Sequence, residues 1–252
     1  MSNYIQIETP DGSFAAYRAQ PVAAKKPVPA IVVIQELFGV NADLRATCDE
    51  LAVLGYLAVS PDLFWRQEPG TDLSDGSESD WNKGLALFNA FDFDAGIADI
   101  AATIEATRSL PGSCGKVGLM GFCMGGLLTY LTTAKCSVDA SVAYYGGGID
   151  QHLEVADEIR TPLLMHFGGD DEYISTPARE AIRSAHATNR CVKIFTYPGQ
   201  KHAFARHGGA HFDASAAELA NRRTHEFFAA HLTERSGQAA TLNVVRTGNE
   251  RH

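Results

Sequence analysis

Residues 116–134 of the chain read KVGLMGFCMGGLLTYLTTA, and this stretch decides the fold. Its beginning is apolar enough for a buried strand, and its end has the length and pattern of a helix. Between the two segments, Gly121 and Gly125 stand two positions on either side of Cys123. A sharp passage from strand to helix strains the central residue and leaves no room for side chains two positions away. The spacing therefore predicts a tight turn that presents Cys123 at a helix N-terminus.

This position suits a nucleophile. The partial positive charge of a helix N-terminus stabilises a thiolate. The turn also has the G-x-S-x-G pattern of the α/β-hydrolase nucleophile, with cysteine in place of serine. The other cysteines, at positions 48, 114, 136 and 191, lack such a turn, and we interpret them as small apolar residues. They contain no CxxC pair and indicate neither a disulfide framework nor a zinc site.

Apolar runs of strand length alternate with segments of helical period along most of the chain. This alternation predicts an α/β-hydrolase fold, with a mostly parallel central sheet flanked by helices. Residues 4–19 predict an antiparallel edge hairpin that turns at Pro10-Asp11-Gly12. Buried strands are expected at 30–35, 57–60, 116–120, 140–145, 163–167 and 192–196, and helices at 43–54, 93–109, 125–134, 177–187 and 214–231. Residues 66–80 are polar and rich in turn formers, and we expect neither helix nor strand there.

The composition is that of a globular protein, with 45% hydrophobic and 20% charged residues among 252. We expect one domain over residues 1–235 and a flexible tail over 236–252, where the apolar periodicity stops. The net charge of −9 makes nucleic acid and anionic membranes poor partners. No stretch approaches the roughly 18 apolar residues of a membrane span. The N-terminal residues do not have the pattern of a signal peptide, so the expected location is the cytoplasm.

The expected acid and base follow the nucleophile in the order that this fold uses. The strand at 163–167 is followed by Asp170 and Asp171, and the strand at 192–196 by His202. Because parallel strands bring their carboxyl ends to one edge of the sheet, either aspartate could reach the histidine. Two further histidines stay open as weaker candidates for the base: His207 and His211.

The first buried strand ends at Gln35, where a loop of this fold supplies part of the oxyanion hole. The expected donors are the backbone N–H groups of Leu37 and Met124. Glu36 is unusual here, because a carboxylate at the end of a core strand must be paired, protonated or functional. A glutamate bound to loop backbone or to water remains the alternative.

At this point the sequence resembles the dienelactone hydrolase family, over residues 4 to 232. The resemblance rests on QELFG at 35–39, SPDL at 60–63, GFCMGG at 121–126, YYG at 144–146, GGDD at 168–171 and HAFAR at 202–206. It implies that Asp171 is the acid of the triad. It also implies that Glu36 contacts the thiol and helps to generate the thiolate, and that Arg206 receives a substrate carboxylate. Four aromatic residues are further candidates for the substrate pocket: Trp81, Phe38, Phe88 and Tyr145.

One position departs from the family pattern. Members that open dienelactones in catechol breakdown carry an arginine where this chain has Trp81, so Arg206 alone remains for a carboxylate, with Lys83 close by in sequence. This departure leaves the catalytic apparatus unchanged but puts the native substrate in doubt.

We therefore predict a hydrolase of a dienelactone-like, carboxylate-bearing lactone or ester. It acts through a Cys123-His202-Asp171 triad and a cysteinyl acyl-enzyme, without a metal or an organic cofactor. The alternatives are a general carboxylesterase or thioesterase, and a ligand-binding or thiol-sensing protein without turnover.

Overall fold

The computed structural model describes residues 3–22 and 24–233. Its strands are β1 (Tyr4–Thr9), β2 (Gly12–Ala19), β3 (Val28–Ile34), β4 (Leu57–Pro61), β5 (Ser113–Phe122), β6 (Ala140–Tyr144), β7 (Leu163–Gly168) and β8 (Val192–Tyr197). Its helices are α1 (Ala42–Val53), α2 (Glu78–Asn89), α3 (Phe93–Ser109), α4 (Met124–Lys135), α5 (Thr176–Ala185) and α6 (Ala214–Leu232), with short 3-10 turns η1 (Ile149–Gln151) and η2 (Leu153–Glu158). The expected tail at 236–252 lies outside the described residues.

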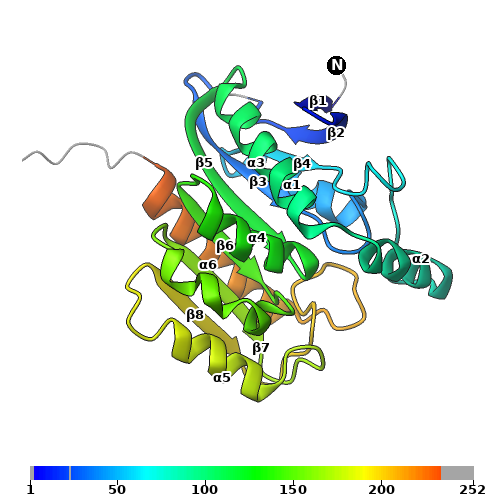
Figure 1. Ribbon diagram of the computed structural model, residues 1–252. Helices are drawn as coiled ribbons and strands as arrows, with labels where there is room; N and C mark the ends of the chain where they lie inside the picture. Colours follow the sequence, from blue (N-terminus) through cyan, green and yellow to red (C-terminus); the bar gives the residue numbers. More distant parts are fainter. Residues whose placement is uncertain (1–2, 23, 234–252) are drawn as a thin grey trace, which may run out of the picture.

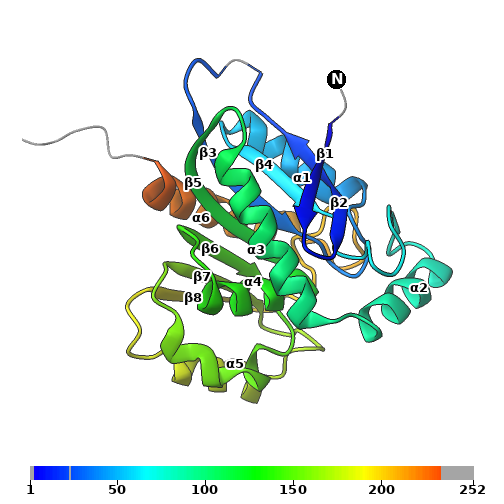
Figure 2. The same ribbon diagram turned by 45° about the horizontal axis from the view of Figure 1, so that its top comes forward.

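The strands form one sheet in the order β1-β2-β4-β3-β5-β6-β7-β8. The hairpin β1–β2 is antiparallel, β2 also pairs antiparallel with β4, and every later pair is parallel. Helices α3 and α4 cover one face of the sheet, and α1 and α6 cover the other (Figures 1 and 2). Covering both faces explains why β4 and β6 are buried along their whole length. The predicted fold class, the hairpin and the six later strands are confirmed.

Helix α2 was not expected. The prediction of an irregular segment holds for residues 66–77 but is wrong for 78–80, where the helix begins. Ser77 caps the helix, because its hydroxyl accepts the Asp80 N–H at 3.3 Å. Helix α2 buries only Gly84 completely, and its apolar residues form a narrow stripe. It lies beside the main body of the protein (Figure 1), so it needs no broad apolar stripe. Over the described residues, no helix is long and apolar enough to cross a membrane.

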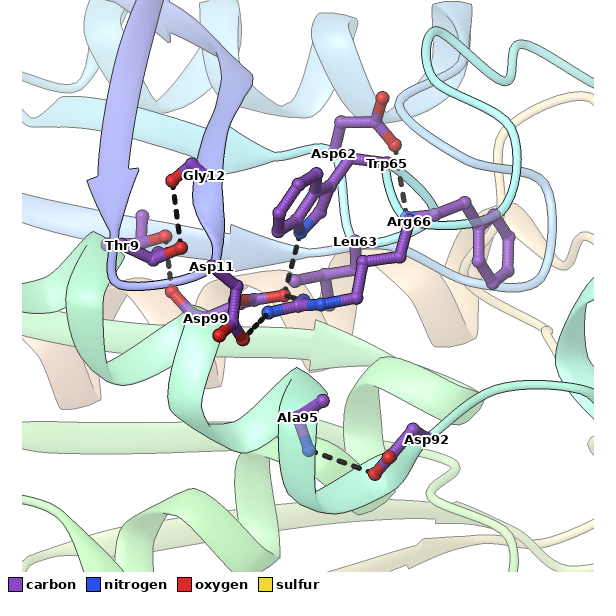
Figure 3. Close-up of polar contacts among 12 residues, drawn as sticks. Thr9, Asp11, Gly12, Asp62, Leu63, Trp65, Arg66, Asp92, Ala95 and Asp99 are labelled. Atoms are coloured by element: carbon purple, nitrogen blue, oxygen red, sulfur yellow. Dashed lines mark hydrogen bonds and ion pairs between the residues drawn. The ribbon is translucent and has the colours of Figure 1, made fainter.

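A buried carboxylate holds the segment after β4 against α3. Asp99 of α3 is only 1% exposed, and it accepts hydrogen bonds from Trp65 Nε1 at 2.8 Å and from Arg66. Arg66 also reaches Asp11 in the hairpin turn, at 2.7 Å, so it lies between the two carboxylates (Figure 3). A buried charge requires such partners. The network fixes where the chain leaves the sheet toward α2.

The predicted turn between β5 and α4 is present, and Cys123 has φ 54° and ψ −116°. This left-handed backbone conformation is strained for a residue with a side chain. A Cβ on Gly121 would lie 2.1 Å from the carbonyl oxygen of Gly125, and one on Gly125 would lie 2.5 Å from that of Gln35. Both glycines are thus required by contact with backbone, which cannot rotate away as a side chain can.

We expect Gly121→Ala to lower the free energy of unfolding by about 3 kcal/mol, because the new methyl group overlaps backbone atoms. Denaturant unfolding measures the change. Gly147→Ala is the matched control, since a Cβ there meets no atom within 4 Å, and it should change stability by less than about 0.5 kcal/mol. Equal losses in the two variants would show that the close backbone contact is not what Gly121 provides.

Candidate active site

Three of the predicted residues meet at the carboxyl edge of the sheet. Cys123 follows β5, Asp171 follows β7 and His202 follows β8. His202 Nδ1 lies 2.9 Å from Asp171 Oδ2, and the His202 side chain hydrogen-bonds to Cys123 on its other side. Asp171 Oδ1 accepts the backbone N–H groups of Tyr173 and Ile174 at 2.9 and 3.1 Å. The carboxylate is therefore fixed, and it orients the imidazole toward the sulfur. Side chains in such contact can act as a nucleophile, a base and an acid.

The surroundings of His202 favour its charged form. Burial lowers the pKa of the imidazole, but the negative charge of a Cys123 thiolate and the hydrogen bonds to Asp171 and Cys123 outweigh burial and raise the pKa to about 10. His202 is therefore held in its imidazolium form when Cys123 is a thiolate. It can stabilise a thiolate beside it and donate a proton to a leaving group.

The other histidines considered as the base lie elsewhere. His211 Nδ1 is 3.1 Å from the backbone oxygen of His202, so it supports the loop that carries His202. His207 packs its ring against Phe212 and lines a separate cavity. Of the two aspartates, it is Asp171 that meets His202.

Both expected oxyanion donors stand beside the nucleophile. Leu37 and Met124 line the same pocket as Cys123. Met124 is the first residue of α4, and the first N–H groups of a helix have no acceptor within the helix. Its N–H is therefore available to an oxygen that develops negative charge next to the sulfur.

Glu36 and Arg206 form an ion pair. Glu36 Oε2 accepts from Arg206 Nε at 2.5 Å, whereas the buried Oε1 has no hydrogen-bond partner within the described residues. Arg206 Nη1 donates to Asp75 Oδ2 at 2.8 Å. Burial lowers the pKa of Arg206, but Glu36 and then Asp75 raise it above its ordinary value, so the guanidinium keeps its charge. Asp75 was not predicted, because nothing in an irregular polar loop distinguishes one acidic residue from the next.

An open pocket of about 510 Å³ leads to the sulfur. Of the predicted substrate-binding residues, Trp81, Phe88 and Arg206 line it together with the nucleophile and base. Lys83 pairs with Glu68 instead. Further lining side chains were missed by the sequence analysis: Leu85, Phe93, Leu127, Gln151, His152 and Tyr173.

The wall formed by α2 is apolar and follows a helical period. Trp81, Leu85 and Phe88 occupy positions i, i+4 and i+7 of that helix, so all three face the pocket. This period was the available signal for Leu85, and it was overlooked because α2 itself was not expected.

Two predicted pocket residues lie behind the pocket surface. Phe38 is buried beneath Trp81, with ring centroids 5.6 Å apart, and the Arg206 guanidinium lies over its ring. Tyr145 is completely buried, and its ring contacts that of His202 edge-on at 5.1 Å. These two rings therefore support Trp81, Arg206 and His202 from below.

A second cavity of about 30 Å³ lies on the inner side of Glu36, with room for about two water molecules. Asp43, His207, His225 and Tyr145 contribute to its lining. Burial, followed by the charge of Glu36, raises the pKa of Asp43 to about 6. Arg206 lines both this polar cavity and the substrate pocket, so its side chain lies between the two.

Known proteins match the chain over nearly its whole described length. The model of the "Dienelactone hydrolase family" matches residues 14–232. The "Carboxymethylenebutenolidase" of Pseudomonas putida is 42% identical over 226 residues, which are 89% of this chain and 95% of that protein. "Carboxymethylenebutenolidase 1" of Cupriavidus pinatubonensis is 35% identical over 230 residues, with 91% and 97% covered.

The fold is also similar to that of solved structures. A crystal structure of a "Putative Dienelactone Hydrolase" from Klebsiella pneumoniae superposes with a TM-score of 0.79 at 28% identity, covering 90% of this chain and 98% of that one. The family match includes the turn at the nucleophile, both loops that carry the acid and the base, and the wall formed by α2. The chain belongs to the dienelactone hydrolase family.

Proposed function

We propose that the protein hydrolyses a lactone or ester through an acyl-enzyme formed on Cys123. Its family makes it a lactone or ester hydrolase. The observation that supports the cysteine mechanism best is the continuous contact from Asp171 through His202 to Cys123 at the end of an open pocket. A small-molecule substrate fits a pocket of about 510 Å³.

The reaction has two stages. The Cys123 thiolate attacks the carbonyl carbon, and the N–H groups of Leu37 and Met124 bind the oxygen that becomes negative. Protonated His202 donates its proton to the departing oxygen as the carbon–oxygen bond breaks. Neutral His202 then takes a proton from water, whose oxygen attacks the thioester and releases the acid and the thiolate. Asp171 holds the imidazole in orientation and stabilises its charged form.

Arg206 gives the pocket a binding group for a carboxylate. The side chain lines the pocket and stays charged, and a guanidinium binds carboxylates through parallel hydrogen bonds. A substrate carboxylate competes with Glu36 for this guanidinium. Release from Arg206 leaves Glu36 as a buried carboxylate without its ion-pair partner. This supports the role of Glu36 in taking the thiol proton.

A general carboxylesterase is the second candidate function. It is favoured by the apolar wall of Trp81, Leu85 and Phe88, which suits neutral aryl or alkyl groups. Comparing turnover of a carboxylated lactone, neutral aryl esters and thioesters distinguishes the two.

Brief treatment with limiting iodoacetamide should label Cys123 before the other cysteines, because His202 stabilises its thiolate. Activity toward p-nitrophenyl acetate should fall in proportion to this label, which mass spectrometry locates. Cys114 is the internal control, since it is exposed and does not line the pocket of Cys123. Cys123→Ala should lower turnover by at least about 10³-fold. Label on Cys114 with activity lost in step, or turnover retained by Cys123→Ala, would refute the assignment.

Glu36→Gln should slow alkylation of Cys123 and ester turnover together, by about 10²–10⁴-fold, if Glu36 takes the thiol proton. Stopped-flow alkylation and steady-state assays measure the two rates. Glu50→Gln is the control, because Glu50 lines the inner cavity without bonding to Arg206. If both rates for Glu36→Gln stay within a few-fold of the wild type, the glutamate serves only to hold Arg206.

A further inference from the structure

Arg206 has few hydrogen-bonding groups left for a substrate. Its Nε donates to Glu36 and its Nη1 donates to Asp75. A carboxylate that binds a guanidinium through two parallel hydrogen bonds uses two of its three nitrogens. The pair that includes Nε is taken by Glu36, and the pair formed by Nη1 and Nη2 has to share Nη1 with Asp75, so a substrate carboxylate either displaces Glu36 or binds directly beside the Asp75 carboxylate.

The loop holds Asp75 in place independently of Arg206. The Leu73 N–H donates to the carbonyl oxygen of Phe38 at 2.9 Å, and the Asn41 side chain donates to that of Leu73 at 3.1 Å. Asp75 also packs closely against Gly209, since a Cβ placed on that glycine would lie only 3.2 Å from Asp75 Oδ2. The loop therefore delivers the carboxylate to Arg206 as a fixed group, at little further cost in conformational entropy.

Charge at this end of the pocket disfavours a second anion. The side chains of Arg206 and Glu36 are each 9% exposed and that of Asp75 is 19% exposed. Two carboxylates against one guanidinium leave a net negative charge on the cluster. Because the cluster is shielded from water, a substrate carboxylate near it is repelled more strongly than at the surface.

We propose that Asp75 is a specificity residue that competes with the substrate carboxylate for Arg206 and shifts the enzyme's preference toward neutral lactones and esters. This inference rests on the proposed function of Arg206. A positioning role would have the opposite effect on carboxylate binding, because Asp75 would then orient Arg206 and help carboxylates to bind. Removing the charge of Asp75 distinguishes the two roles by the direction of the effect.

The test compares 4-acetoxybenzoate with its neutral methyl ester, because both present the same acetyl group to the sulfur. Asp75→Asn should raise kcat/KM for 4-acetoxybenzoate about tenfold, equivalent to about 1.4 kcal/mol, mainly through a lower KM. The value for the methyl ester should stay within about twofold. Asp75→Ser provides the same comparison should the asparagine disturb the loop.

Asp72→Asn is the matched control. It removes a charge from the same loop, but Asp72 pairs with Arg45 and not with Arg206. It should leave the preference between the two esters unchanged. In an Arg206→Ala background, the gain from Asp75→Asn should be smaller, because the competition for the guanidinium is lost and only the repulsion between the two carboxylates remains.

A fall in kcat/KM for 4-acetoxybenzoate in Asp75→Asn, an equal change for both esters, or the same gain from Asp72→Asn would overturn the proposal. If the wild type hydrolysed neither ester, nor any other ester or lactone, the proposed function itself would fail. Hydrolysis of both esters with a preference that Asp75→Asn leaves unchanged would overturn only the role of Asp75.

Discussion

The close backbone contact around the nucleophile is the constraint on which the site depends. Gly121 and Gly125 let the end of β5 turn into α4 without a gap, and Gly125 also packs against the carbonyl oxygen of Gln35 at the end of β3. On the other side, the Cys123 N–H donates to the Tyr144 carbonyl oxygen at the end of β6, at 3.0 Å. The turn is thus held between the ends of β3 and β6. The strain of Cys123 persists because the sheet on both sides permits no other path.

Around this turn, charge is arranged in two buried groups that share one edge of the sheet. Asp171 and His202 form one group beside Cys123, and Glu36, Arg206 and Asp75 form the other. Buried ion clusters stabilise a fold weakly once the loss of hydration is included. The second cluster is therefore better explained by selectivity or proton transfer than by stability.

The sequence predicted the elements whose residue types are restricted by burial or by close backbone contact. Parallel strands covered on both faces leave continuous apolar runs, and the turn at Cys123 leaves two obligatory glycines. For the same reason, the loops after β7 and β8 could be assigned to the acid and base. The choice of Asp171 over Asp170 came only from the family resemblance, since the two are neighbours in one loop. Helix α2 buries only one residue completely, and its short apolar period at Trp81, Leu85 and Phe88 was not recognised, so Leu85 was missed with it.

Chemistry and selectivity are carried by separate lengths of chain. Cys123, Asp171 and His202 follow strands of the sheet, but the apolar wall and Asp75 come from the excursion between β4 and α3. That excursion is tied down at its start by Asp99 and in its middle by the backbone of Phe38. Substitutions along its exposed length leave the turn at Cys123 untouched. Changes in this one segment can therefore reshape the pocket for other acyl and alcohol groups without moving the strand ends that hold Cys123.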